Sequence, residues 1–504
     1  MGDKAASAKI SANLDSNDHF LKSRLGIDDT FDISFRELII KEQKLHLYYL
    51  NGMCSTTVIQ EIIMTLLELN NESAHEEDVI EENELLNDKE AIEEIKNQIA
   101  HYSVDEKTTY DDAINMLLAG LLTIFIEGIN YAIVIDTRQY PGRSPQEPDT
   151  ERVIRGARDG FTENIVENTT LLRRRIRDER LRNEMMQIGQ RSKTDVCVSF
   201  IKDIADDNLV EIIKNKLGEI DIDGIPMADK TVEEFIIEQK WNAFPLVRYT
   251  ERPDIAAKHL LEGRVLIFVD TSPSIIIVPT TYFDHLEHAE EYRQSPMVGT
   301  FIRIVRLFAV FMSIFLLPLW MLFVMEPSLL PEKLSYIGPK EQGNIHIIYQ
   351  IIMADFGVEF LRMAAIHTPT PLATAMGLIA AILIGQIAVD VGLFTPEVIL
   401  YVAVSTIGSY VTPSYELSVA NKLLKILLLI LTALFSIPGF MIGVVLSVLY
   451  LSSIKTLLTP YLYPLIPFNA KALLDSVLRI PMTYANVRPR IVRPKNKYSQ
   501  PRDR

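Results

Sequence analysis

Three charged residues lie in an otherwise apolar segment, residues 345–366, in the C-terminal half of the chain. Asp355, Glu359 and Arg362 stand at i, i+4 and i+7, which places them on one face of a helix. Burying charges in hydrocarbon is costly, so this face must meet water, a partner or an opposite charge. One interpretation is a water-filled ion path lined by these residues. The other is an amphipathic helix that lies at a membrane surface.

Two more polar residues stand at the end of an apolar stretch downstream, at positions 386 and 390. Polar side chains at membrane depth are expensive and are commonly functional. The candidate pore-lining residues are therefore Asp355, Glu359, Arg362, Gln386 and Asp390.

A second group of charged residues is rich in arginine and lies between residues 138 and 190. Guanidinium groups bind phosphates, but no aromatic residues interleave these arginines and the surrounding half of the chain is acidic, which argues against nucleic acid. We expect contacts with acidic neighbours in the same subunit or the next one, or with lipid headgroups. The candidate interdomain or subunit contacts are Arg143, Glu147, Arg155, Arg158, Arg173, Arg174 and Arg175.

Signatures of catalysis and of metal binding are missing from the sequence. It has no G-x-x-x-x-G-K-[ST], no H-E-x-x-H and no G-x-S-x-G. His285 and His288 form a close pair without an evident third ligand, and Cys54 and Cys197 stand outside any metal or disulfide spacing. We therefore expect no enzyme activity, no catalytic residue, no cofactor and no metal site.

The elements that must position the charged face belong to a membrane region. From residue 298 onward there are 17 Lys/Arg against 10 Asp/Glu, so this part carries +7, and the first 297 residues carry −23 of the total of −16. Stretches of 18 to 29 uncharged residues approach or exceed the roughly 20 apolar residues that cross a bilayer. They are 307–325, 371–389, 398–415 and 426–454.

The flanking charges predict the orientation of these spans. Arginines precede the first stretch, the tail is basic, and the first 20 residues contain no apolar run, so we expect both termini in the cytoplasm. An even number of crossings follows. There are four if 426–454 crosses once, bent at Pro438-Gly439. There are six if it folds as a hairpin and 345–366 also crosses.

An internal repeat organises the acidic half. Gly120-Leu-Leu-Thr-Ile-Phe-Ile-Glu matches Gly263-Arg-Val-Leu-Ile-Phe-Val-Asp at an offset of 143, and each copy has a helical run before its glycine. The predicted fold class is an α/β cytoplasmic region of two related subdomains plus an α-helical polytopic membrane domain. The expected divisions are a mobile leader 1–30, subdomains 31–137 and 191–283, a charged linker and long helix 138–190 (the helix from 163 to about 187), transmembrane domain 298–455 and basic tail 456–504.

Several motifs resemble a known family, the A subunits of the GerA-type spore germination receptors of endospore-forming bacteria. They are Arg143-Ser-Pro-Gln-Glu-Pro-Asp-Thr-Glu-Arg-Val-Ile-Arg-Gly-Ala-Arg-Asp-Gly-Phe-Thr-Glu, Asn168-Thr-Thr-Leu-Leu-Arg-Arg-Arg-Ile, Arg252-Pro-Asp and Leu261-Glu-Gly-Arg-Val-Leu-Ile-Phe-Val-Asp. Typical receptor subunits have Arg-Gly-Pro where this chain has Arg155-Gly-Ala. This departure, with Glu291-Tyr-Arg-Gln-Ser-Pro, favours a branch of the family outside the nutrient receptors.

The resemblance implies a protein of the spore inner membrane. Family A subunits are thought to form ring oligomers, proposed pentamers, that act as an ion channel during germination, and the favoured branch is thought to amplify germination by releasing ions beside a small membrane partner. The expected partners are further copies, other spore germination membrane proteins and the bilayer, with no nucleic acid. Two alternatives stay open: a nutrient receptor subunit that works with B and C subunits, and a non-conducting membrane scaffold.

Overall fold

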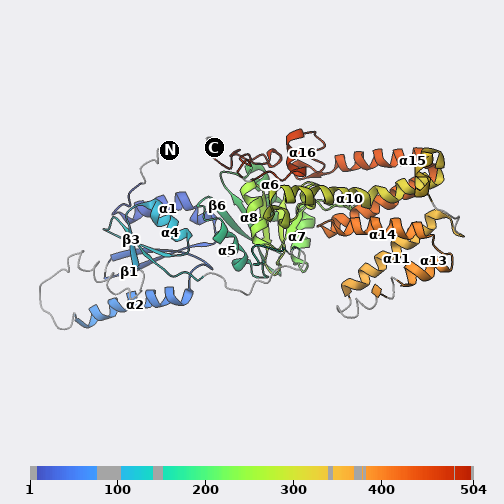
Figure 1. Cartoon of the computed structure of the whole chain (residues 1–504). Helices are drawn as coiled ribbons and strands as arrows, with labels where there is room; N and C mark the ends of the chain where they lie inside the picture. The colour runs from blue at the N-terminus through green and yellow to red at the C-terminus, as the bar shows by residue number, and fades with distance from the viewer. Residues whose placement is uncertain are drawn as a thin grey trace.

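The computed structural model describes residues 8–41, 43–76, 104–139, 151, 153–338, 344–367, 377–378, 382–481 and 483–500. The chain forms three bodies in a row, which are two α/β units followed by a group of long helices (Figure 1). Arg143 and Glu147 lie outside the described residues.

The first α/β unit contains a five-stranded sheet in the order β1-β2-β4-β5-β3, with every neighbouring pair antiparallel. Helices α1, α2 and α4 pack on this sheet, and residues of α1, α2, α4 and the strands share one apolar core. The elements are α1 Leu14–Leu25, η1 Ile27–Asp29, β1 Ile33–Ile40, β2 Gln43–Leu50, α2 Thr56–Glu76, β3 Val104–Lys107, α4 Tyr110–Leu118, β4 Leu122–Ile126 and β5 Ala132–Ile135.

The second α/β unit has a sheet in the order β6-β7-β9-β10-β8, again antiparallel throughout. One apolar core lies between this sheet and helices α6 and α7, and another lies between its other face and helices α5 and α8. The elements are α5 Ile165–Arg175, β6 Leu181–Ile188, β7 Thr194–Ile201, α6 Asp207–Gly218, α7 Ala228–Ile236, β8 Arg248–Thr250, α8 Pro253–Glu262, β9 Val265–Val269 and β10 Ile275–Val278.

The two sheets therefore share one strand order, position by position along the chain. The first residues of β4 and β9 are 143 positions apart, and so are the last residues of β5 and β10. Gly120 and Gly263 precede β4 and β9 with φ of 91° and 104°, a left-handed conformation that glycine adopts without strain. The matched hairpins that the sequence indicated are present, and a helix also precedes each pair of leading strands.

Two predicted segments differ in the structure. Residues 14–25, expected in a mobile leader, form α1, because Leu14, Leu21 and Leu25 bury one helix face on the first sheet. The long helix expected from 163 to about 187 ends at Arg175. Residues 181–188 instead pair with the whole of β7, and this tertiary pairing outweighs local helix propensity. The other subdomain boundaries remain predictions.

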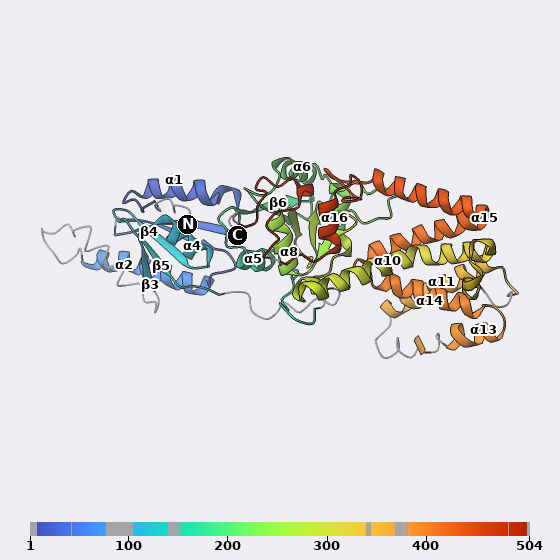
Figure 2. The ribbon, with the colours of Figure 1, turned by 45° about the horizontal axis from the view of Figure 1, so that its top comes forward.

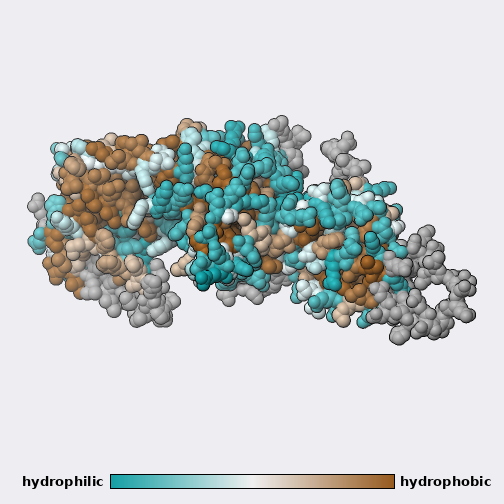
Figure 3. All heavy atoms as spheres, turned by 180° about the vertical axis from the view of Figure 1, so that it is seen from behind, coloured by the Kyte–Doolittle hydropathy of each residue, from teal (hydrophilic) through white to brown (hydrophobic). Residues whose placement is uncertain are grey.

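The helical region begins after a short connection from the second unit. Among the described residues, two helices, α10 and α15, are long and apolar enough to cross a membrane. Apolar side chains gather over this end of the face shown in Figure 3, while polar ones cover much of the α/β side. The elements are η2 Asp284–Leu286, α9 Ala289–Arg293, α10 Pro296–Met325, η3 Pro327–Leu329, η4 Glu332–Ile337, α11 Ile347–His367, a π-helix Leu383–Ile387 (η5), α13 Ala388–Asp390, α14 Pro396–Tyr410 and α15 Tyr415–Ser453.

Helix α15 is a hairpin of two arms and not one straight rod. Ser436 has φ 52° and ψ −129°, and a Cβ on Gly439 would collide with the backbone oxygen of Leu431, so the arms meet closely at the bend. Both ends of α15 return to the second α/β unit, since Glu416 pairs with Lys230 and Tyr450 bonds to the loop after α7. Figure 2 shows the arms meeting at the end of the molecule farthest from the α/β units. Of the two arrangements considered for residues 426–454, this is the hairpin.

The C-terminal tail runs back along the second α/β unit. Its elements are β11 Lys455–Thr456, β12 Thr459–Pro460, α16 Ala470–Val477 and η6 Arg490–Val492. The Lys495 backbone N–H donates to the carbonyl of Ile204. Val492, three residues earlier in the chain, is buried. The tail thus lies on the α/β side of the helical region.

Candidate functional site

The charged face of α11 meets lysines of the first arm of α15. Lys425 Nζ lies 2.7 Å from Asp355 Oδ1, and Lys422 Nζ lies 2.7 Å from Glu359 Oε2. Glu359 also pairs with Arg362 one turn along α11. We name these five residues the charged seam.

Helical spacing explains why the seam forms. Asp355, Glu359 and Arg362 share one face of α11, while Lys422 and Lys425 stand three residues apart on α15, so two charged faces oppose each other. The Arg362 guanidinium lies 4.9 Å from the ring centre of Tyr415, the first residue of α15. Lys425 stands ten residues farther on, about 15 Å along the helix at 1.5 Å per residue. The seam therefore runs from the end nearest the α/β units well into the helical region.

Burial increases along the seam. The side chains of Glu359 and Lys422 are 21% and 15% exposed, whereas those of Asp355 and Lys425 are 2% and 3% exposed. Asp355 Oδ2 is buried without a hydrogen-bond partner in the described part of the chain, and Lys422 Nζ is 3.7 Å away from it. The outer end can thus exchange with water, and the inner end holds a carboxylate whose second oxygen is under-coordinated.

Helix α11 packs within the helical region with its charged face toward α15. Ile351 and Ala354 of α11 join Leu317 of α10, Val398 of α14 and Leu429 of α15 in one apolar cluster. The helix is therefore packed into the bundle, with its charges turned toward α15. An opposite charge, one of the three environments that the sequence required, is what this face meets.

Gln386 and Asp390 lie elsewhere. Gln386 is exposed in the π-helix Leu383–Ile387, and Asp390 is exposed at the end of α13. The structure groups Asp355, Glu359 and Arg362 and leaves these two outside the seam.

Sequence reasoning missed Lys422 and Lys425. The signal was available, because two lysines three residues apart directly precede an uncharged run of 29 residues. Their spacing also complements the carboxylates of the segment 345–366. What the sequence does not reveal is that the partners, 70 residues apart for Asp355 and Lys425, come together.

A second ionic cluster joins the second α/β unit to α10. Glu291, fully buried, lies 2.5 Å from Arg303 Nε and also pairs with Arg306. Behind it, Glu287 pairs with Lys258 at 3.0 Å and Asp284 with Arg264 at 2.7 Å. We call this set of residues the junction network: Arg248, Lys258, Arg264, Asp284, Glu287, Glu291, Arg303 and Arg306.

Three histidines lie in or beside this network: His259 in α8 of the second unit, and His285 and His288 in the connection to α10. Burial lowers the pKa of His285 to about 3 and the pKa of His259 to about 4, and the nearby arginines and lysine act in the same direction. Burial, with Arg306 and Arg248, also lowers the pKa of His288 to about 4. All three imidazoles are neutral near pH 7. Among the described residues no cluster of His, Cys, Asp and Glu could hold a metal ion.

One arginine of α5, Arg173, connects the two α/β units. Arg173, 1% exposed, places its Nε 2.9 Å from Asp32 at the start of β1 and bonds to the carbonyls of Asp178 and Leu181. Arg175 pairs with Asp159. Arg155, Arg158 and Arg174 are exposed.

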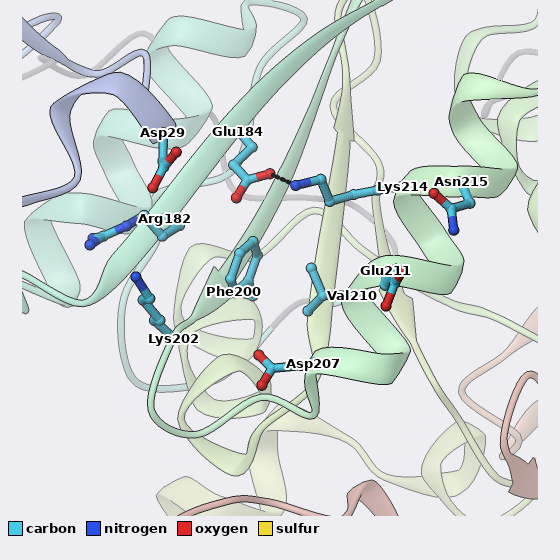
Figure 4. A pocket seen from close by; sticks show the side chains of 10 residues that line it. All are labelled: Asp29, Arg182, Glu184, Phe200, Lys202, Asp207, Val210, Glu211, Lys214 and Asn215. Atoms are coloured by element: carbon cyan, nitrogen blue, oxygen red, sulfur yellow. Dashed lines mark ion pairs between the residues drawn. The ribbon is translucent and has the colours of Figure 1, made fainter.

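A pocket of about 430 Å³ lies beside the contact between the two units. Figure 4 shows that its side chains come from β6, β7, the turn after β7 and α6 of the second unit, with Asp29 from the first. Lys214 lies 2.5 Å from Glu184 there, and further carboxylates and cations alternate around the wall. Because neither sign of charge predominates, the lining points to no single class of ligand. The lining residues are Asp29, Arg182, Glu184, Phe200, Lys202, Asp207, Val210, Glu211, Lys214 and Asn215.

Comparisons with known proteins match almost the whole chain. A family model described as Bacillus/Clostridium GerA spore germination protein matches residues 19–491. Stage V sporulation protein AF of Bacillus subtilis is 53% identical over 99% of both chains, and spore germination protein KA of the same organism is 28% identical over 98% of this chain and 89% of that protein. Among solved structures, the chain is similar to the crystal structure of the N-terminal domain of the A subunit of the Bacillus megaterium spore germinant receptor GerK3, with 28% sequence identity. The match covers 55% of this chain and 98% of that one, with a TM-score of 0.41.

Proposed function

The chain belongs to the GerA family of spore germination proteins, and on that premise we propose that it is an ion-conducting membrane subunit of a spore germination complex. In this proposal it resides in the spore inner membrane with both termini in the cytoplasm. Several copies, five in the arrangement implied by the family, form a ring that releases ions and thereby amplifies germination.

The charged seam is the observation that carries the proposal. Ionisable residues within membrane helices are costly, and they commonly mark ion pathways. Here carboxylates of α11 lie along a line that is partly exposed at one end and buried at Asp355. We propose that this line is the cytoplasmic half of the ion path, and that the paired lysines hold it closed. Gln386 and Asp390 remain proposed lining residues of the opposite half.

Six crossings fit this proposal best. Trp320 of α10 bonds to the carbonyl of Ile337, and Gln350 of α11 accepts from the N–H of Thr395, so these ends gather at the side away from the α/β units. Helices α11 and α14 then run back toward those units, and the two arms of α15 run out and return. The remaining crossing is the stretch 371–389 predicted from the sequence, much of which lies outside the described residues.

An exposed apolar stripe on α11 supports the oligomer. Met353, Phe356, Phe360 and Met363 are between 46% and 65% exposed and follow helical spacing. In the proposed ring this stripe packs against a neighbouring copy, next to the seam. The other germination proteins of the complex occupy the remaining lipid-facing surface.

The test removes one positive and one negative charge together. Replacing the carboxylates alone would leave Lys425 buried without a counter-charge, at a cost of about 3–5 kcal/mol, so loss of function could reflect misfolding. The double variant Asp355→Asn/Lys425→Gln avoids this. If the seam conducts, the cation flux after germination is triggered falls in spores that carry this variant, because the path has lost a carboxylate, while protein abundance in the membrane stays normal. Loss of Lys425 affects how tightly the path closes before the trigger.

A matched control removes an ion pair at the surface. Arg191 and Asp223 lie 3.4 Å apart with side chains 83% and 76% exposed, so Arg191→Gln/Asp223→Asn should leave release unchanged. Normal release by the seam variant at normal abundance would reject conduction through the seam and favour a scaffold. Purified protein that forms no ring would reject the oligomeric channel.

A further inference from the structure

A tight turn after α7 presents a fully exposed tryptophan. The N–H of Asn242 donates to the carbonyl of Gln239 at 3.0 Å, and the Gln239 side-chain amide donates to the carbonyls of Asn242 at 3.1 Å and Phe244 at 3.3 Å. Trp241 stands between them with a relative exposure of 101%. In water-soluble proteins large aromatic side chains are mostly buried. A rigid turn that presents one outward therefore indicates a contact surface.

The turn is attached to the end of a lipid-facing helix. Tyr450 O–H donates to Asn242 Oδ1 at 2.8 Å, and the rings of Tyr450 and Phe244 lie 6.2 Å apart. Tyr450 is near the end of the second arm of α15, whose Val445, Leu446 and Leu449 are all more than half exposed. Trp241 is the neighbour of Asn242, one Cα–Cα step of about 3.8 Å away. The tryptophan therefore stands where the apolar surface of the arm gives way to the α/β unit.

We propose that the Trp241 turn inserts into the headgroup region of the bilayer and fixes the second α/β unit against the membrane surface. Tryptophan favours this region because its ring is apolar and its N–H can bond to water or to headgroups. Tyr410, the last residue of α14, and Tyr415, the first residue of α15, are each 54% exposed and lie close together in the chain. With Tyr450 they make an aromatic belt, and the turn continues it onto the α/β unit. The inference does not depend on ion conduction.

The charges around the turn argue against an electrostatic contact. Lys240 lies 3.4 Å from Glu238, which also lies 3.9 Å from Lys216. This cluster attracts anionic headgroups weakly, so the indole must supply the contact. We therefore expect insertion into phosphatidylcholine alone, with no requirement for anionic lipid.

Fluorescence tests the contact because the chain has only two tryptophans. Trp320 is 2% exposed, and Trp320→Phe leaves Trp241 as the single emitter. In nanodiscs of phosphatidylcholine we expect emission shifted to short wavelength, strong quenching by lipid brominated near the headgroup and weak quenching by iodide. Long-wavelength emission quenched by iodide and untouched by bromine would overturn the proposal. So would short-wavelength emission without bromine quenching, which means a contact with a second copy, or quenching that requires anionic lipid.

A second measurement leaves Trp320 in place, because Trp320→Phe alters the helical core. Trp241→Cys is labelled with a nitroxide, since the natural cysteines Cys54 and Cys197 are buried. The label should be more accessible to oxygen than to a water-soluble nickel complex. A label at Met64→Cys, 62% exposed on α2 of the first unit, is the control and should show the reverse. Equal behaviour of the two labels would overturn the membrane contact.

Discussion

The two α/β units share a strand order but have different neighbours. Edge strand β3 of the first unit has exposed side chains at its two central residues, Asp105 and Glu106. The matching strand β8 buries Arg248, whose guanidinium donates to the carbonyls of Asp284 and Glu287 in the connection to α10. The same strand framework thus occurs twice, and the residues at matching positions determine which copy contacts the C-terminal helices.

The offset of 143 makes the comparison residue by residue. In the first unit Met116, Ala119, Leu121 and Val134 form a small apolar cluster. The matching positions of the second unit are His259, Glu262, Arg264 and Ile277, and three of these are ionisable. Arg264 pairs with Asp284. The positions that form an apolar cluster within the first unit thus bind the connection to α10 in the second unit.

The largest expected effect comes from breaking the contact between the second unit and α10. Glu291→Gln removes the carboxylate that faces Arg303 and Arg306, leaving two buried guanidinium groups poorly compensated. We expect a loss of about 3–5 kcal/mol of stability, measured as a fall in thermal unfolding temperature of the detergent-solubilised protein. Asp105→Asn on the exposed edge of β3 is the control and should change stability by less than about 0.5 kcal/mol. Equal shifts for both variants would contradict the comparison.

The second prediction exchanges matched residues between the units. Arg264→Leu copies Leu121 and leaves Asp284 buried without its partner, and we expect a loss of about 2–4 kcal/mol. The double variant Arg264→Leu/Asp284→Asn should recover part of that loss, since no unpaired carboxylate remains. Leu121→Arg should also destabilise the first unit, because its apolar cluster offers no counter-charge there. A stable Leu121→Arg protein would show that the two faces are interchangeable.

The third prediction concerns acid. The folded pKa of His259 is about 4 and that of His285 about 3, both below the ordinary value of 6.5, so the unfolded state binds more protons between these values. Stability of the second unit should therefore fall as pH drops below 6.5 and continue to fall to about pH 4. Each histidine contributes at most about 1.4 kcal/mol per pH unit over this range, and His285→Gln should remove the whole contribution of that histidine. Hydrogen exchange followed by mass spectrometry measures this unit by unit, and earlier opening of the first unit would refute it.

The smallest effects are expected at the matched glycines. Gly120→Ala and Gly263→Ala both force a side chain into a left-handed conformation, which costs about 1–2 kcal/mol. A new Cβ at position 120 would lie 3.0 Å from Met53 Cβ, whereas one at position 263 would lie 3.3 Å from Ile204 Cγ2. Gly120→Ala should thus lower the unfolding temperature slightly more. The reverse order would mean that the two turns do not constrain the chain alike.

Much of this architecture could be predicted from local sequence. The hairpins around Gly120 and Gly263 repeat a pattern of apolar strands that needs no distant information. The charged face of α11 follows from spacing alone. By contrast, α1 and β6 were missed because their structure depends on packing and pairing with other elements, and Lys422 and Lys425 were missed because their partners lie on another helix.

The bend at Ser436 has a consequence for the lipid around the protein. It divides α15 into arms of 21 and 17 residues, residues 415–435 and 437–453, and α14 has 15 residues. At 1.5 Å per residue the second arm is about 26 Å long and α14 about 23 Å, less than the roughly 30 Å of a typical hydrocarbon core. If these segments cross as proposed, two of the crossing segments in each subunit are too short for a typical bilayer. The lipids beside them must thin, and the surroundings of α14 and of the second arm should be the most sensitive to acyl-chain length.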